Sequence, residues 1–262
     1  MKISYLYILA LLLSVISCSK TNTAEYGGKN GDICIVGASI AHPENGWFEM
    51  GCEELEMNPI NRSISGTGIG DTAVLMSMGL QFAEGEHDKF ELFVIMHVKN
   101  FDVCDVSQIA EDHNSYHISQ QMNATQAFDY VIKRYIEECR ALEFNPQSKW
   151  YGCDGGKPVH ILLCTHWHDA RTTYNESVRR LCERWSDICT LCEFDTNIGF
   201  TKDTPDADGN QISLQFTQND NGKQEVIDGI TYGWHPQRGR NAEIQQRMAK
   251  IFVDAVKDIQ NL

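Results

Sequence analysis

DICIVGAS, residues Asp32 to Ser39, is the stretch that decides the fold. Its core, Ile33–Val36, is an unbroken apolar run rich in β-branched residues, which predicts a short buried strand. Gly37 and Ala38 then predict a tight turn that presents the Ser39 hydroxyl. A strand that is apolar on both sides is typical of a parallel sheet with helices on both faces, so the fragment predicts an α/β fold.

Strands and helices alternate along the rest of the chain. Strands are predicted at 61–64, 90–98, 159–164 and 190–194, and helices at 47–57, 71–81 (with Asp71 as N-cap), 123–144, 174–187 and 241–259. A late β-hairpin is predicted from 212–218 and 223–230, joined by a turn at Asn219–Gly222. This order indicates a doubly wound, flavodoxin-like sandwich of about five parallel strands, whose active crevice lies at the carboxyl ends of the strands.

Length and charge restrict the class of protein. The chain has 262 residues, enough for one α/β domain, which we assign to 32–262. Its net charge is −14, from 22 Lys and Arg against 36 Asp and Glu. Because that balance repels phosphate backbones, we expect no nucleic-acid partner.

The first residues read as a targeting segment. Ile3–Val15 is an apolar run, too short for a stable membrane anchor but typical of a signal peptide, assigned to 1–17. The run ends in Ser17-Cys18, which resembles a bacterial lipobox and implies lipidation of Cys18. Residues 18–31 would then be a polar tether, and the protein exported and lipid-anchored to a bacterial membrane, facing the periplasm or the surface. The alternative is an ordinary secretory signal.

Nine cysteines follow Cys18, an odd number, so at least one thiol has no partner within the chain. Cys189 and Cys192 form a CxxC motif. Zinc would need a fourth ligand, and the chain has no second CxxC. Buried thiols or a disulfide are the expected state.

Four polar groups are expected at the carboxyl edge of the sheet. Ser39 follows the first strand, Ser63–Gly66 follows the second, Asn100 follows the third, and His235 precedes the last helix. Acyl transfer needs a nucleophile, a base and donors for an oxyanion, which a hydroxyl, an imidazole, an amide and a backbone turn can supply. Such residues are also common in loops, so spacing alone leaves the assignment open.

These motifs resemble, in order and spacing, those of the SGNH hydrolases, also called GDSL-like esterases. The blocks are Val36–Ser39, Asn61–Gly66, Val98–Asn100 and Tyr232–Pro236, and the resemblance covers about 32–257. It implies an SGNH-type α/β sandwich and carboxylic ester hydrolysis without a cofactor or a metal.

Carried over residue by residue, the resemblance makes Ser39 the nucleophile and His235 the general base. The oxyanion hole would consist of the backbone N–H groups of Ser39 and Ser63 and the side-chain amide of Asn100.

The chain departs from the family pattern at four positions. Ala38 replaces Asp, Ser63 replaces Gly, Val98 replaces Gly, and Tyr232 stands where the family has the Asp that orients the histidine. A backbone carbonyl or Asp228 at the end of the hairpin could take that role. We expect a working Ser-His dyad or an incomplete triad.

His166 and His168 follow the fourth strand, with Asp169 adjacent. At this spacing both rings point the same way on an extended chain, which is consistent with a metallohydrolase ligand set. We instead expect the two histidines, with Trp234, to form a substrate-binding wall of the crevice.

The sequence therefore predicts an exported serine esterase that cleaves short acyl esters, with acetyl groups on carbohydrates implied by the family. The expected partners are a small-molecule or glycan ester and, through the N-terminal lipid, the membrane. The alternatives are a non-catalytic glycan-binding lipoprotein on the same fold and a metallohydrolase built on His166 and His168.

Overall fold

The computed structural model describes residues 31–98, 103–218 and 224–260. One five-stranded sheet forms its centre, with strand order β2-β1-β3-β4-β5 and every neighbouring pair parallel. The strands are β1 (Asp32–Gly37), β2 (Asn58–Asn61), β3 (Phe90–Met96), β4 (Ile161–Cys164) and β5 (Cys189–Cys192). The predicted fold class, an α/β sandwich with about five parallel strands, is confirmed.

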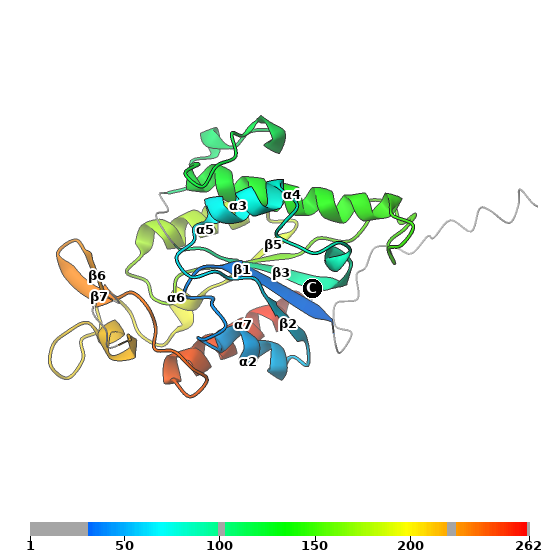
Figure 1. Ribbon diagram of the computed structural model, residues 1–262. Helices are drawn as coiled ribbons and strands as arrows, with labels where there is room; N and C mark the ends of the chain where they lie inside the picture. Colours follow the sequence, from blue (N-terminus) through cyan, green and yellow to red (C-terminus); the bar gives the residue numbers. More distant parts are fainter. Residues whose placement is uncertain (1–30, 99–102, 219–223, 261–262) are drawn as a thin grey trace, which may run out of the picture.

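Helices cover both faces of the sheet (Figure 1). The α-helices are α2 (Trp47–Glu54), α3 (Ile69–Ser77), α4 (Ala124–Ala141), α5 (Thr172–Arg184), α6 (Phe194–Asn197) and α7 (Glu243–Gln260). The 3-10 helices are η1 (Glu86–Lys89), η2 (Val106–Gln108), η3 (His113–Ser115), η4 (Leu142–Phe144) and η5 (Ile212–Phe216). Helices α3, α4 and α5 lie on one face, and α2 and α7 lie on the other. Within the described ranges, no helix is both long enough and apolar enough to cross a bilayer.

The strand order places the end of β1 at the topological switch point. The chain runs from β1 to β2 on one side and later returns to β3 on the other, so crossovers leave β1 in opposite directions. Gly37 ends β1 in register with Met96, and a Cβ at this glycine would lie 2.7 Å from the Met96 carbonyl oxygen. The absence of a side chain therefore lets β1 and β3 approach closely at the carboxyl edge of the sheet, where ligands of such sheets bind.

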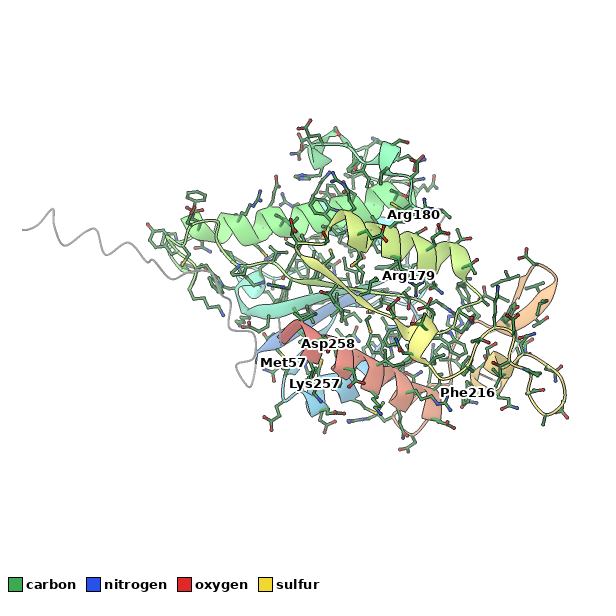
Figure 2. The ribbon with its side chains drawn as sticks, turned by 180° about the vertical axis from the view of Figure 1, so that it is seen from behind. Met57, Arg179, Arg180, Phe216, Lys257 and Asp258 are labelled. Atoms are coloured by element: carbon green, nitrogen blue, oxygen red, sulfur yellow. The ribbon has the colours of Figure 1, made fainter. Side chains whose placement is uncertain are left out.

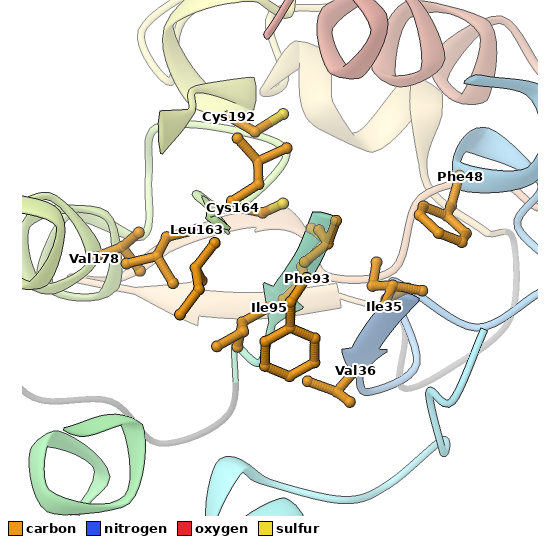
Figure 3. Packing of buried hydrophobic residues seen from close by; sticks show 14 of the residues in the cluster. Ile35, Val36, Phe48, Phe93, Ile95, Leu163, Cys164, Val178 and Cys192 are labelled. Atoms are coloured by element: carbon orange, nitrogen blue, oxygen red, sulfur yellow. The ribbon is translucent and has the colours of Figure 1, made fainter. Parts of the chain in front are cut away.

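The apolar runs of the sequence form the strands whose side chains make up the hydrophobic core. Side chains such as Phe93 and Ile95 on β3 and Leu163 on β4 are buried between the sheet and its helices (Figure 3). The outer side of α7 is polar instead, with Lys257 and Asp258 on the surface (Figure 2). Helix α4 begins as predicted, because the Asn123 side chain accepts hydrogen bonds from Thr125 N and Gln126 N.

Two element boundaries differ from the prediction. Strand β2 covers 58–61 rather than 61–64, so the Ser63 segment is a loop. Helix α3 begins at Ile69, and Asp71 is not its N-cap. The Asp71 carboxylate accepts a hydrogen bond from Gly68 N at 2.7 Å from within the first turn. Asp71 thus supports the helix start from the third position.

The predicted hairpin is wrong in its first arm. Residues 212–216 form η5, and the hairpin consists of β6 (Gln224–Ile227) and β7 (Ile230–Gly233). Asp228 and Gly229 make its turn with φ of 51° and 80°, the sign that a two-residue hairpin turn favours. The predicted turn at Asn219–Gly222 lies outside the described residues.

All nine cysteines in the described ranges are free thiols, so Cys189 and Cys192 take the first of their two expected states, buried thiols or a disulfide. Most are buried, and burial raises the pKa of the Cys189 and Cys192 thiols well above the usual value. The signal segment and Cys18 lie outside the described residues.

Candidate active site

Ser39 stands in a turn that is held from within by one buried amide. The Asn45 side chain is 1% exposed, and its Nδ2 group donates to the carbonyl oxygens of Ser39 (2.6 Å), Ile40 (2.9 Å) and His42 (3.1 Å). The Trp47 indole also donates to the Ile40 carbonyl, at 2.9 Å. The turn after β1 is therefore ordered by side chains of the following segment, in place of the absent Asp at position 38.

The structure brings Ser39 and His235 together. Ser39 Oγ lies 2.6 Å from His235 Nε2, within the range of a short hydrogen bond. Both residues are half-buried. A serine hydroxyl becomes a useful nucleophile when a neighbouring base accepts its proton, and this contact has the required geometry.

The pair opens into a cavity of about 420 Å³. Its wall includes Ile40, Met96, Val98 and Trp234, the loop 65–67, and Arg238 at one side. The size is that of a pocket for a small ligand, and its surface is mainly apolar around the Ser39 hydroxyl. The prediction that Trp234 faces the crevice agrees with this lining.

The segment before His235 is fixed by the buried residues that follow β4. His168 Nε2 lies 2.6 Å from the Gly233 carbonyl oxygen, and the Trp167 indole donates to the Trp234 carbonyl at 3.1 Å. Since a carbonyl only accepts, His168 carries its proton on Nε2. A Cβ on Gly233 would lie 1.8 Å from Thr217 Oγ1, so this close packing requires glycine.

The expectation that His166 and His168 form a substrate-binding wall is wrong. Their exposures are 0% and 1%, and neither lines the cavity. Burial lowers the pKa of His168 to about 4 and that of His166 well below its usual value. Both are neutral structural groups that position the histidine segment, because the hairpin covers the end of β4.

Asp228 lies at the opposite end of the hairpin from the segment that carries His235. It sits in the hairpin turn, whereas Gly233 at the other end of β7 pairs with Gln224. At about 3.3 Å per residue, the turn lies roughly 16 Å from Gly233. Tyr232, in the position of the family Asp, is buried and stacks on His168 with ring centroids 6.1 Å apart. The described chain thus offers an aromatic contact where the family has a carboxylate.

The predicted oxyanion donors have three different outcomes. The Ser39 backbone N–H has no hydrogen-bond acceptor in the described part of the chain, which leaves it available. The Ser63 N–H instead donates to Asn61 Oδ1 at 2.9 Å. Asn100 lies outside the described residues. The oxyanion hole that the resemblance implies therefore stays a prediction, with the Ser63 N–H already bound to another acceptor.

Sequence reasoning missed Arg171 and Glu225. The Arg171 guanidinium donates to both Glu225 carboxylate oxygens, at 3.0 and 2.5 Å, and lies 3.5 Å above the Trp234 ring. No local pattern marks the two residues, because 54 positions separate them.

The hypothesis of a metal site at His166 and His168 is opposed by the hydrogen bonds that these side chains and their neighbours already make. Ligand atoms of His166, His168 and Glu225 lie within 4.8 Å of one another. However, His168 Nε2 donates to Gly233, and Glu225 already binds the Arg171 cation. A metal ligand must offer a lone pair, so this arrangement favours a hydrogen-bonded network over a metal centre.

Residues 30–260 match the family described as Domain of unknown function (DUF5040). No curated protein matches the sequence. Among solved structures, the chain is similar to a lipolytic protein of the G-D-S-L family from Desulfitobacterium hafniense, with 11% identity, 86% of this chain and 99% of that chain covered, and a TM-score of 0.45.

A second similar structure is the psychrotrophic esterase EstA from Pseudoalteromonas sp., with 12% identity, 89% and 100% of the two chains covered, and a TM-score of 0.45. A third is a family two carbohydrate esterase from Clostridium thermocellum, with 15% identity, 88% and 65% covered, and a TM-score of 0.39.

Proposed function

The chain belongs to the family described as Domain of unknown function (DUF5040), and from the geometry of its candidate site we propose that it is a serine esterase. One observation carries the proposal: Ser39 Oγ lies 2.6 Å from His235 Nε2 at the edge of a cavity of about 420 Å³. A nucleophile and a base in contact at the carboxyl edge of a parallel sheet form the minimal unit of acyl transfer.

The proposed reaction has two half-reactions. Ser39 Oγ attacks the ester carbonyl carbon while His235 Nε2 takes the hydroxyl proton, and the Ser39 N–H stabilises the oxyanion. His235 then gives this proton to the leaving alcohol, which departs from an acyl-serine. A water molecule gives a proton to His235 and attacks the acyl carbon. The bond from that carbon to Ser39 Oγ then breaks, His235 returns the proton to Ser39 Oγ, and a carboxylic acid is released.

The proposed substrates are short acyl esters, with acetyl groups on carbohydrates as the favoured class. The cavity is small, and Ile40 and Met96 give it an apolar lining suited to a short acyl chain. Trp234 offers an aromatic surface beside His235, with ring centroids 5.6 Å apart, against which a sugar ring can pack.

The direct test is turnover of 4-nitrophenyl acetate and of an acetylated xylooligosaccharide by the wild type and by Ser39→Ala and His235→Ala. We expect loss of turnover in both variants and labelling of Ser39 in the wild type by a fluorophosphonate. Ser77→Ala and His117→Ala, at exposed positions on α3 and in the loop before α4, are the matched controls. A wild type that neither turns over these esters nor reacts with the fluorophosphonate contradicts the proposal.

One observation favours a second candidate, a non-catalytic glycan-binding protein on the same fold. The Ser63 N–H donates to Asn61 rather than toward the cavity, which weakens the oxyanion hole. Calorimetric titration with acetylated and deacetylated oligosaccharides separates the two candidates. A binder retains equal affinity in Ser39→Ala and releases no acetate.

We propose in addition that the protein is exported and anchored by a lipid on Cys18. The support is the apolar run before Ser17-Cys18. Growth with an alkyne-bearing fatty acid should label the wild type but not Cys18→Ala, and the wild type should sediment with membranes. Labelling that persists in Cys18→Ala contradicts the anchor.

A further inference from the structure

Arg171 connects four segments that meet behind the proposed catalytic pair. It precedes α5, just beyond the end of β4. Its guanidinium binds the Glu225 carboxylate of β6 through two nitrogens, donates to the Val98 carbonyl at 3.1 Å, and covers the Trp234 ring at 3.5 Å. A planar fork with five donors can make all these contacts at once, which a lysine ammonium cannot.

The contacts are enclosed. Side-chain exposures are 19% for Arg171 and 14% for Glu225. Burial raises the pKa of Glu225 and lowers that of Arg171, and their mutual attraction opposes both shifts. Each charge in this partly dry environment needs the other, so removal of either leaves a costly uncompensated group.

The residues around Arg171 also contact the segment that carries His235. Trp234 is its neighbour in the chain, and the two rings stand perpendicular at 88°. The Trp234 carbonyl is held by Trp167 and the Gly233 carbonyl by His168, so the backbone before His235 is fixed from one side. Arg171 fixes the Trp234 side chain, which is otherwise half-exposed in the cavity wall. A misplacement of about 1 Å can cost on the order of 100-fold in rate, so such support matters.

We infer that Arg171, held by Glu225, is a positioning residue for the esterase reaction: it fixes the Trp234 ring, and through it His235, against the end of β3. The inference rests on the proposed function and assigns a role outside the Ser-His pair. Arg171 neither lines the cavity nor touches Ser39, so it acts through Trp234 rather than on the substrate.

The test compares Arg171→Gln, Arg171→Lys and Glu225→Gln with Arg179→Gln. Arg179 is the matched control, because it lies on α5, the helix that Arg171 precedes (Figure 2), and binds Glu193 and Asp195 away from the cavity. For 4-nitrophenyl acetate we expect kcat to fall about 100-fold in Arg171→Gln, with KM changed less than about threefold. Arg171→Lys should fall by an intermediate factor, and Arg179→Gln should retain the wild-type kcat.

A second measurement separates positioning from folding. In Arg171→Ala, added guanidinium ion should restore part of kcat and of the rate at which a fluorophosphonate labels Ser39. Sodium at equal ionic strength should not. A variant that has merely lost its fold gains nothing from guanidinium.

Two outcomes overturn the inference and remain distinguishable. If the wild type is active and depends on Ser39, but the Arg171 variants keep its kcat or lose no more than Arg179→Gln, the positioning role is wrong and the esterase stands. If Arg171→Ala is inactive and guanidinium restores nothing, the loss is structural and the inference is again wrong. A wild type without turnover or labelling removes both proposals.

Discussion

Ser39 Oγ and His235 Nε2 lie 2.6 Å apart although 196 positions separate them in the chain. Ser39 is carried by the turn after β1, and His235 by the segment between β7 and α7. The parallel sheet brings these ends to one edge, and the side chains around them set the distance. The predictions below test how each part of this arrangement contributes.

The first prediction concerns the pair itself. Ser39→Ala and His235→Ala should each lower kcat by about 1000-fold or more, and the double variant should be no slower than the worse single variant. The reason is that each residue acts only through the other. Steady-state kinetics on 4-nitrophenyl acetate gives kcat for the wild type, the two single variants and the double variant. Additive losses in the double variant would show two independent roles instead.

Gly233 should tolerate no side chain. A Cβ there would lie 1.8 Å from Thr217 Oγ1 and 2.7 Å from the Ser213 carbonyl oxygen, so Gly233→Ala must displace the hairpin from η5. We expect a loss of about 2 kcal/mol or more in the free energy of unfolding, together with loss of turnover. Urea titration measures the first quantity. Gly68→Ala is the control, since its nearest contact would be an ordinary 3.9 Å; equal effects at both sites would contradict the packing argument.

Asn45 should be needed for the turn that carries Ser39. Asn45→Ala removes the side-chain donor of three carbonyl oxygens. The Ile40 carbonyl keeps the Trp47 indole and the His42 carbonyl keeps the backbone N–H of residue 45, so the Ser39 carbonyl is the one that loses its partner, and we expect a loss of about 1 to 3 kcal/mol in unfolding free energy. Fluorophosphonate labelling of Ser39 should slow in parallel. The exposed Asn197, whose amide also donates to a carbonyl, provides the comparison: Asn197→Ala should cost less than about 0.5 kcal/mol.

Stability should fall in mild acid. Burial lowers the pKa values of His97 and His168 to about 4, from 6.5 in an unfolded chain. Between these values the unfolded chain binds protons that the folded protein does not. The free energy of unfolding therefore decreases as pH falls from about 6.5 to 4, on the order of 3 kcal/mol for each histidine.

The check is denaturant unfolding at several pH values between 7 and 4.5. His97→Asn and His168→Asn should each flatten the dependence, whereas His117→Asn, at an exposed position, should not. A dependence that is equally steep in all three variants would assign the acid sensitivity to other groups.

Metal removal should leave the esterase reaction unchanged. His168 Nε2 donates to the Gly233 carbonyl and Glu225 is bound to Arg171, so two of the three candidate ligands already serve as structural partners. Dialysis against a chelator should keep kcat within about twofold, and added Zn²⁺ should not raise it. A fall in kcat on chelation that added Zn²⁺ reverses would support the metallohydrolase hypothesis instead.

Local patterns were sufficient for most of the fold. The apolar run of β1, the longer run of β3 and the helical periodicity of α4 and α7 indicated these elements, because burial on two faces or on one stripe leaves a regular trace in sequence. The prediction failed at Ile212–Phe216, where a pattern compatible with a strand forms η5. There, tertiary contacts decide: Gly233 N donates to Ser213 Oγ, and Thr217 Oγ1 donates to the Ser213 carbonyl.

The sequence by itself determined the fold class and, through the order of its motifs, pointed to Ser39 and His235 as partners. Only the tertiary structure decided what surrounds them: Asn45 under the turn, the buried His168 on Gly233, the Arg171–Glu225 pair on Trp234, and the place of Asp228 in the hairpin turn. The physical reason is the separation along the chain of the residues that interact. Strand and helix patterns reflect neighbours a few residues apart, whereas these hydrogen bonds and ion pairs join side chains brought together by packing, and a single sequence carries no periodic signal for them.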